Sequence, residues 1–284
     1  MSIFFDFDGT ITAQDTIGEL ANFALWTRAA ADGVDLQAEW DGVVQAYVDD
    51  HRAHVADYAP HPAARRLPAQ EVAFLRHMKA AETRSLGRVT DCALFKGIDG
   101  AAFREAGRRL VREGAIELRP GFADFVDRRV AEGWRVWVLS VNWSAAFIEG
   151  ACGHGSLGVI ANEVREDGSI AGPAVLNPAG TVKSQQRNLT NSCDKLDAMR
   201  AVLEAEALTA RPAVYFGDST TDLECLLAAN RGFVISDGDD SALLATLRRI
   251  GREVPHVRDA GARGGGLAWA SHFECIPDEE FNLG

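Results

Sequence analysis

The sequence lacks the features that mark several large classes of protein. It has no run of about 18 apolar residues, so no segment is predicted to span a bilayer. The first residues carry no basic region and reach a carboxylate at Asp6, which argues against a secretory signal. The five cysteines are widely spaced and contain no C-x-x-C pair. We therefore expect free thiols in a reducing compartment, and a cytoplasmic protein.

Positive charge is also scarce. The 284 residues include 29 Lys and Arg against 41 Asp and Glu, which gives a formal net charge of −12. This balance argues against a nucleic acid or an anionic membrane as partner. Apolar residues make up 47% of the chain, which is typical of a globular protein with a core of ordinary size. No heptad repeat or exposed apolar seam stands out, so the sequence predicts no particular oligomeric state.

The pattern of apolar residues changes along the chain. Residues 3–5 form a short apolar run that predicts a buried strand, and residues 15–118 have helical spacing almost throughout. From residue 120 onward, predicted strands at 136–139, 159–161, 170–171, 213–216 and 233–235 alternate with predicted helices. A glycine-rich stretch at 261–266 predicts a flexible link, which leads into an expected edge strand at 267–270.

Strand and helix alternation of this kind predicts an α/β fold: a Rossmann-like parallel sheet with helices on both faces. The predicted core comprises residues 1–14 and 119–284, and it is interrupted after its first strand by an all-helical cap at residues 15–118. Two independent domains are the alternative. That arrangement would leave the first strand without partners, which disfavours it.

Polar side chains follow three of the predicted strands, at the edge where parallel sheets bind ligands. Asp6 and Asp8 end the first strand and lie two residues apart, so both carboxylates should point to one side. Ser140 ends a second strand, and Asp218 and Asp222 follow a third. Carboxylates brought together in this way would resist ionising unless a cation neutralised them.

Mg²⁺ fits such a set, because it prefers a few carboxylates together with water and phosphate oxygen. No His or Cys belongs to the cluster, so zinc is disfavoured. Lys195, which opens the helix before the third strand, would join Ser140 and the amides of a glycine-containing loop to receive a tetrahedral anion. The chemistry best served is phosphoryl transfer to a carboxylate, followed by hydrolysis.

These residues resemble the motifs of the haloacid dehalogenase (HAD) superfamily of aspartate-nucleophile phosphatases. The four motifs occur in order: Asp6-x-Asp8-Gly9-Thr10, Ser140, Lys195 and Gly217-Asp218-x-x-x-Asp222. Residues 15–21 and 118–122 are similar to the phosphoserine-phosphatase-like branch, which carries its helical cap between motifs one and two.

The resemblance implies a catalytic role for four residues. Asp6 would be the nucleophile that becomes an aspartyl phosphate, and Asp8 would be the general acid and then the general base. Ser140 would bind phosphoryl oxygens, and Lys195 would offset the charge on Asp6. Lys183 competes for the lysine role, but Lys195 is favoured because it begins a helix and its distance from Asp218 suits this branch.

The resemblance also implies metal ligands. Mg²⁺ would be held by the Asp6 carboxylate, the Asp8 main-chain carbonyl and Asp218, with Asp222 either as a further ligand or directly behind the ligands.

Three more residues are predicted to face the substrate. Val141 and Asn142 follow Ser140 where relatives usually have a small residue, so we expect them to crowd the pocket. Asp15 lies where the branch has a substrate-facing acid, but it could equally be a helix N-cap.

The predicted function is therefore Mg²⁺-dependent hydrolysis of a small phosphorylated metabolite. A haloacid dehalogenase is disfavoured, because those enzymes lack the second aspartate. A phosphomutase and a non-catalytic binding protein on the same scaffold stay open, as does phosphoserine phosphatase proper. The candidates for holding a phosphoserine carboxylate are four arginines of the cap: Arg104, Arg108, Arg109 and Arg112.

Overall fold

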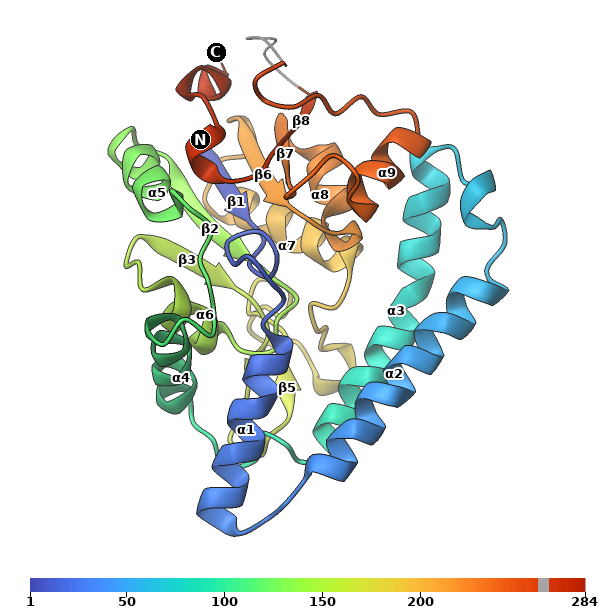
Figure 1. Cartoon of the computed structure of the whole chain (residues 1–284), viewed down its shortest axis with the longest axis vertical. Helices are drawn as coiled ribbons and strands as arrows, with labels where there is room; N and C mark the ends of the chain where they lie inside the picture. The colour runs from blue at the N-terminus through green and yellow to red at the C-terminus, as the bar shows by residue number, and fades with distance from the viewer. Residues whose placement is uncertain (260–265, 284) are drawn as a thin grey trace.

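A six-stranded sheet forms the centre of the protein in the computed structural model, which describes residues 1–259 and 266–283 (Figure 1). The strand order is β3-β2-β1-β6-β7-β8, and every neighbouring pair is parallel. The predicted Rossmann-like sheet is thus confirmed. Its strands are β1 (Ser2–Phe5), β2 (Arg135–Leu139), β3 (Leu157–Ile160), β6 (Ala213–Gly217), β7 (Arg231–Ile235) and β8 (Gly266–Ala270).

Two other predicted strands have different outcomes. The expected edge strand is present as β8, paired with β7. Residues 170–171 do not join the main sheet: β5 (Ile170–Ala171) pairs antiparallel with β4 (Glu163–Val164) in a separate ribbon. The predicted link at 261–266 lies outside the described residues, apart from its last glycine in β8.

Both faces of the sheet are buried, which explains why β1 is apolar at every position but its first. Ile3 and Phe5 belong to the core on one face and Phe4 to the core on the other, as alternation along a strand requires. Phe5, Phe216 and Phe233 stack across three strands, with centroids 4.8 Å apart at each step. The covering helices are α5 (Phe122–Ala131) and α6 (Ala145–Cys152) on the first face, and α7 (Ser192–Ala205), α8 (Leu223–Ala228) and α9 (Ala242–Arg249) on the second.

The segment between β1 and β2 is helical, as predicted. Its α-helices within residues 15–118 are α1 (Ile17–Asp32), α2 (Gln37–Asp57), α3 (Pro68–Asp91) and α4 (Gly100–Arg112). Helices α2 and α3 form a long pair beside the core (Figure 1). Pro68 is the first residue of α3, where a missing backbone N–H costs no helical hydrogen bond.

Three ion pairs connect α3 to the second helical layer of the core. In each pair the carboxylate is buried, so the charge depends on its partner. The pairs are Arg76 with Glu224 of α8 (2.5 Å), Lys79 with Asp194 of α7, and Glu71 with Arg249 of α9 (2.9 Å). Helix α3 is therefore anchored to three core helices.

Helix α4 packs against the core helix α6, backbone to backbone. A Cβ atom on Gly150 would lie 1.9 Å from the carbonyl oxygen of Arg104, and one on Gly107 would lie 2.2 Å from that of Phe147. Only glycine permits this approach. The predicted insert at residues 15–118 thus contains two parts, α1–α3 near the strand ends and α4 on the core (Figure 1). Among the described helices, none has the length and apolar character needed to cross a membrane.

Candidate active site

The loop after β1 brings the first and last motifs together. Gly9 has φ +76°, and a Cβ atom there would lie 2.3 Å from Oδ2 of Asp218. Both the backbone conformation and the close approach therefore require glycine. Thr10 donates a hydrogen bond from Oγ1 to Oδ1 of Asp218 at 3.0 Å. This explains why a glycine and a threonine follow the two aspartates.

Lys195 lies in the first turn of α7 and is fully buried. Its Nζ is 2.7 Å from Oδ1 of Asp6 and 2.7 Å from Oδ1 of Asp222. Burial alone would lower the pKa of Lys195, but the charges of Asp222 and Asp6 outweigh it and raise that pKa. Lys195 is thus a fixed positive charge against Asp6, whereas the backbone of Lys183 lies in the short helix η2 (Lys183–Gln185).

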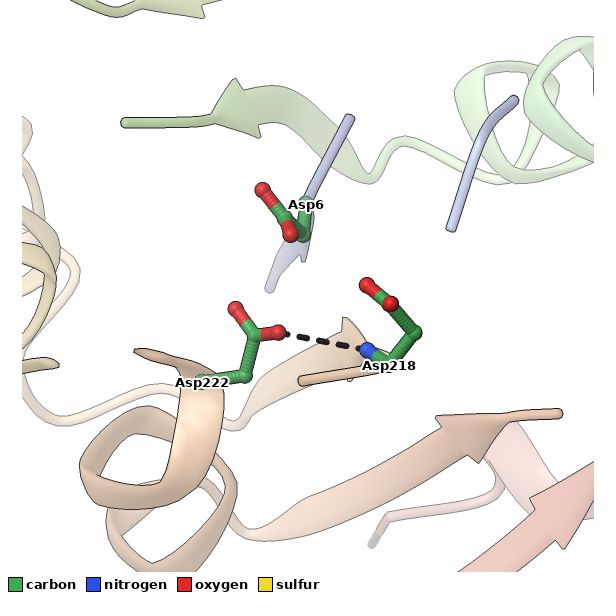
Figure 2. Close-up of side chains that lie close together, drawn as sticks. All are labelled: Asp6, Asp218 and Asp222. Carbon is green, nitrogen blue, oxygen red and sulfur yellow. Dashed lines mark hydrogen bonds between the residues drawn. The ribbon is translucent and has the colours of Figure 1, made fainter. Parts of the chain in front are cut away.

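Three carboxylates converge beside this lysine. Asp6, Asp218 and Asp222 each offer an oxygen atom, and these atoms lie within 4.8 Å of one another (Figure 2). Burial, reinforced by the charge of Asp222, raises the pKa of Asp218 to about 7, and the same two causes raise that of Asp6 well above its usual value. A cation would relieve this repulsion, and an all-oxygen donor set fits a hard ion such as Mg²⁺.

Asp222 differs from the other two carboxylates because protein groups contact both of its oxygens. Oδ1 accepts hydrogen bonds from Lys195 and from the Tyr215 hydroxyl, each at 2.7 Å. Oδ2 accepts from the amide of Asp218 at 3.2 Å (Figure 2) and from the amide of Ser219 at 3.1 Å. This arrangement favours the second predicted role for Asp222, behind the ligands, where it positions Lys195 and the Asp218 loop.

Asp8 is fixed by three hydrogen bonds. Its Oδ1 accepts from the amide of Thr16 at 2.8 Å and from the hydroxyl of Thr16 at 2.6 Å, and its Oδ2 accepts from Asn142 at 3.0 Å. Burial is the largest influence on the pKa of Asp8 and raises it, helped by the charge of Asp15. A held carboxyl group with a raised pKa is suited to donating a proton.

The prediction that Asn142 faces the substrate is wrong. Its side chain is buried and is occupied by the hydrogen bond to Asp8 and a second, at 3.3 Å, to Thr16. Ser140 is also fully buried, and its Oγ accepts a hydrogen bond from the amide of Asn142 at 3.1 Å. Val141 does line the cavity above the aspartates. Asn142 therefore orients Asp8, whereas Val141 and Trp143 of this loop line the cavity.

Asp15 is not the N-cap of α1, because that position is taken by Thr16. Asp15 lines the cavity, and its Oδ1 accepts a hydrogen bond from the amide of Ile17 at 2.8 Å, at the start of α1.

A cavity of about 580 Å³ lies between the strand ends and α1–α3. Asp6, Asp8 and Asp218 lie on its inner side. Its outer walls are mostly apolar and aromatic, and they include Ile17, Trp40, Val43, Tyr47, Leu86, Val89 and Trp143. Such a volume suits a small metabolite.

Sequence reasoning missed Glu82 and Tyr47, which share a hydrogen bond of 3.1 Å at the cavity. A signal for Glu82 was present. The acid falls within the buried face of α3, next to Ala81 and ahead of Leu86, where an apolar residue would be expected. Sequence alone offered no comparable signal for Tyr47.

The four cap arginines do not line the cavity in the part of the chain that the structure describes. They lie on α4, which packs on α6. Arg104 pairs with Glu149, and Arg108 and Arg112 pair with Glu105. The proposed grip on a phosphoserine carboxylate therefore has no support from these residues.

Comparison with known proteins identifies the family. The model of the haloacid dehalogenase-like hydrolases matches residues 3–227. The CTO1 family protein C17G9.12c of Schizosaccharomyces pombe is 29% identical over 233 residues, which are 78% of this chain and 76% of that protein. The mitochondrial Bifunctional TH2 protein of Arabidopsis thaliana is 24% identical over 273 residues, 88% of this chain but 40% of that protein. A Bordetella pertussis Tohama I protein of unknown function shares the fold, with a TM-score of 0.55, 18% identity, and coverage of 95% of this chain and 98% of that one. With its motifs gathered at one sheet edge and more than three quarters of its length matched, this chain belongs to the haloacid dehalogenase-like hydrolases.

Proposed function

We propose that this hydrolase is a Mg²⁺-dependent phosphatase that hydrolyses a small phosphorylated metabolite through an aspartyl-phosphate intermediate. One observation carries the proposal: Asp6, held 2.7 Å from the buried ammonium of Lys195, opens together with Asp8 onto a single cavity. A nucleophile paired with a fixed positive charge and a nearby proton donor is what displacement at phosphorus needs.

In the first step, a carboxylate oxygen of Asp6 forms a bond to phosphorus while the bond between phosphorus and the leaving alcohol breaks. Asp8 gives its proton to the leaving oxygen, a role that its raised pKa favours. In the second step, Asp8 takes a proton from water, the water oxygen bonds to phosphorus, and the bond to Asp6 breaks. Lys195 offsets the negative charge beside Asp6 in both steps.

The carboxylates of Asp6 and Asp218 and the main-chain carbonyl of Asp8 would hold the metal. Bound there, Mg²⁺ would supply positive charge to the phosphoryl oxygens. Asp222 would act through its hydrogen bonds to Lys195 and the Asp218 amide.

A screen of phosphorylated metabolites for release of inorganic phosphate, with Mg²⁺ and with a chelator, tests the proposal. Asp6→Asn should abolish the Mg²⁺-dependent release. The matched control is Asp124→Asn, on the exposed side of α5, which should leave it unchanged. Normal activity in the Asp6→Asn protein would overturn the mechanism.

Different outcomes distinguish the remaining alternatives. A phosphomutase would move the phosphoryl group within the substrate without releasing phosphate. A non-catalytic binding protein would fail to form a beryllofluoride mimic of the phosphoenzyme. A haloacid dehalogenase is disfavoured, because Asp8 is present and held by three hydrogen bonds.

A further inference from the structure

The cavity is strongly one-sided in charge. Five carboxylates line it: Asp6, Asp8, Asp15, Glu82 and Asp218. Among the side chains that the structure describes, which leave out that of Lys183, no Lys, Arg or His lines it. Asp6, Asp8 and Asp218 are accounted for by the proposed metal and proton transfer. Asp15 and Glu82 belong to the helical insert, at the side where the leaving alcohol would lie.

Neither of these two outer acids forms an ion pair among the described residues, unlike the three acids that anchor α3. Glu82 is half-buried and accepts the hydrogen bond of Tyr47, a neutral donor. Burial raises the pKa of Glu82, because its ionised form loses water without gaining a positive partner. Glu82 is therefore a half-buried carboxyl group at the cavity whose described partner is neutral.

The remainder of the outer wall is apolar and aromatic. Trp40 of α2 and Trp143 meet edge to face, with ring centroids 6.0 Å apart at 84°. Val43 and Leu86 extend the wall from α2 and α3. Aromatic faces beside a carboxylate attract a cation while burying the apolar body that carries it.

We propose that the substrate is a phosphate monoester whose alcohol carries a positive charge on an apolar, ring-sized body, with Glu82 and Asp15 binding the charge and Trp40 and Trp143 enclosing the body. This inference rests on the proposed phosphatase function and specifies its substrate class. A second anionic group on the alcohol, such as the carboxylate of phosphoserine, would face two acids and no base, and is excluded by repulsion.

Binding of two matched alcohols tests the inference without requiring catalysis. N-(2-hydroxyethyl)pyridinium and 2-phenylethanol have nearly the same shape and differ by one positive charge. Titrated into the full-length protein with Mg²⁺ and followed by calorimetry, the cation should bind about tenfold more tightly, as expected for a partly desolvated charge near a carboxylate and aromatic rings. Equal dissociation constants would overturn the inference.

Variants identify the residue that recognises the charge. Glu82→Gln keeps the shape and the acceptor for Tyr47 but removes the charge, so the preference for the cation should fall several-fold. The matched control is Glu39→Gln, an exposed acid on α2 outside the cavity lining, which should retain the full preference. An unchanged preference in the Glu82→Gln protein would contradict the proposed recognition.

The phosphate esters of the same two alcohols separate this inference from the proposed function. Faster Mg²⁺-dependent hydrolysis of the pyridinium ester supports both. Equal hydrolysis of the two esters keeps the phosphatase and removes the charge preference. If neither ester is hydrolysed while the cationic alcohol still binds more tightly, the charge preference stands and the phosphatase proposal falls.

Discussion

At the scale of single residues, Gly9 sets the distance between the first and last motifs. Gly9→Ala would place a methyl group 2.3 Å from the Asp218 carboxylate and strain a backbone at φ +76°. We expect phosphatase activity to fall by at least about 100-fold, because a shift of about 1 Å at the reacting groups is enough for that. Gly153→Ala is the control: Gly153 has φ +60° but open space around it. Its variant should lose roughly 1–2 kcal/mol of stability and little activity. Equal activity losses in the two variants would contradict this explanation.

Substitution of Lys195 should reduce both the stability and the activity of the protein. Lys195→Met would leave Asp6 and Asp222 buried without their positive partner. Breaking a buried ion pair in this way costs about 3–5 kcal/mol, which urea unfolding would measure, and activity should disappear as well. Lys183→Met, at the other lysine that the sequence left open, should change neither quantity. A full exchange of the two results would assign the catalytic lysine to Lys183.

Asn142 and Asp222 show how far residue-level prediction reaches. Order along the chain and position at strand ends were enough to select both residues. Their partners are decided by folding: Asn142 bonds to Asp8 across 134 positions, and Asp222 bonds to Tyr215 and Lys195 from different elements. Sequence spacing does not contain such contacts, so the predicted role of Asn142 was wrong and the two roles predicted for Asp222 could not be told apart.

At the scale of secondary-structure elements, the contact between α4 and α6 depends on missing side chains. Gly150→Ala would place a Cβ atom 1.9 Å from a backbone oxygen of α4, which cannot rotate away. We expect the free energy of unfolding to fall by about 2–3 kcal/mol. Gly87→Ala, at an exposed glycine of α3 with nothing within 4 Å, should instead raise it by about 0.5–1 kcal/mol. Thermal or urea unfolding of the two variants measures both changes. A change of the same sign in the two variants would contradict this explanation.

The strands were easier to predict than the packing of the helices. Buried parallel strands such as β1 and β6 appear as continuous apolar runs, because both of their faces are covered. The helical spacing in residues 15–118 specified helices but not their neighbours. The attachment of α4 to α6 rests on Gly107 and Gly150, and a lone glycine in a helix has no unique meaning in a sequence.

At the scale of the whole molecule, binding of Mg²⁺ should raise the free energy of unfolding. The acidic group of Asp6, Asp218 and Asp222 is strained by mutual repulsion, so Mg²⁺ should favour the folded state. At a concentration 100 times the dissociation constant the gain is about 2.7 kcal/mol, or a rise in melting temperature of roughly 5–10 °C. Asp218→Asn should lose most of this rise in a thermal-shift assay, whereas Asp124→Asn should keep it. No rise in the wild-type protein at saturating Mg²⁺ would argue against a metal at these residues.

The anchoring of α3 has a consequence for how this enzyme could acquire new substrates. Lifting α3 would take Asp194 and Glu224 away from the cations of Lys79 and Arg76. Such a movement would therefore be opposed by several kcal/mol. Glu82, the group proposed to contact the leaving alcohol, lies one turn beyond Lys79 on the same helix, so these ion pairs also fix its position relative to Asp6. Substrate specificity would then change only when side chains on α3 are replaced. Adjustment to the size of the substrate would come from the α1 and α2 side of the cavity.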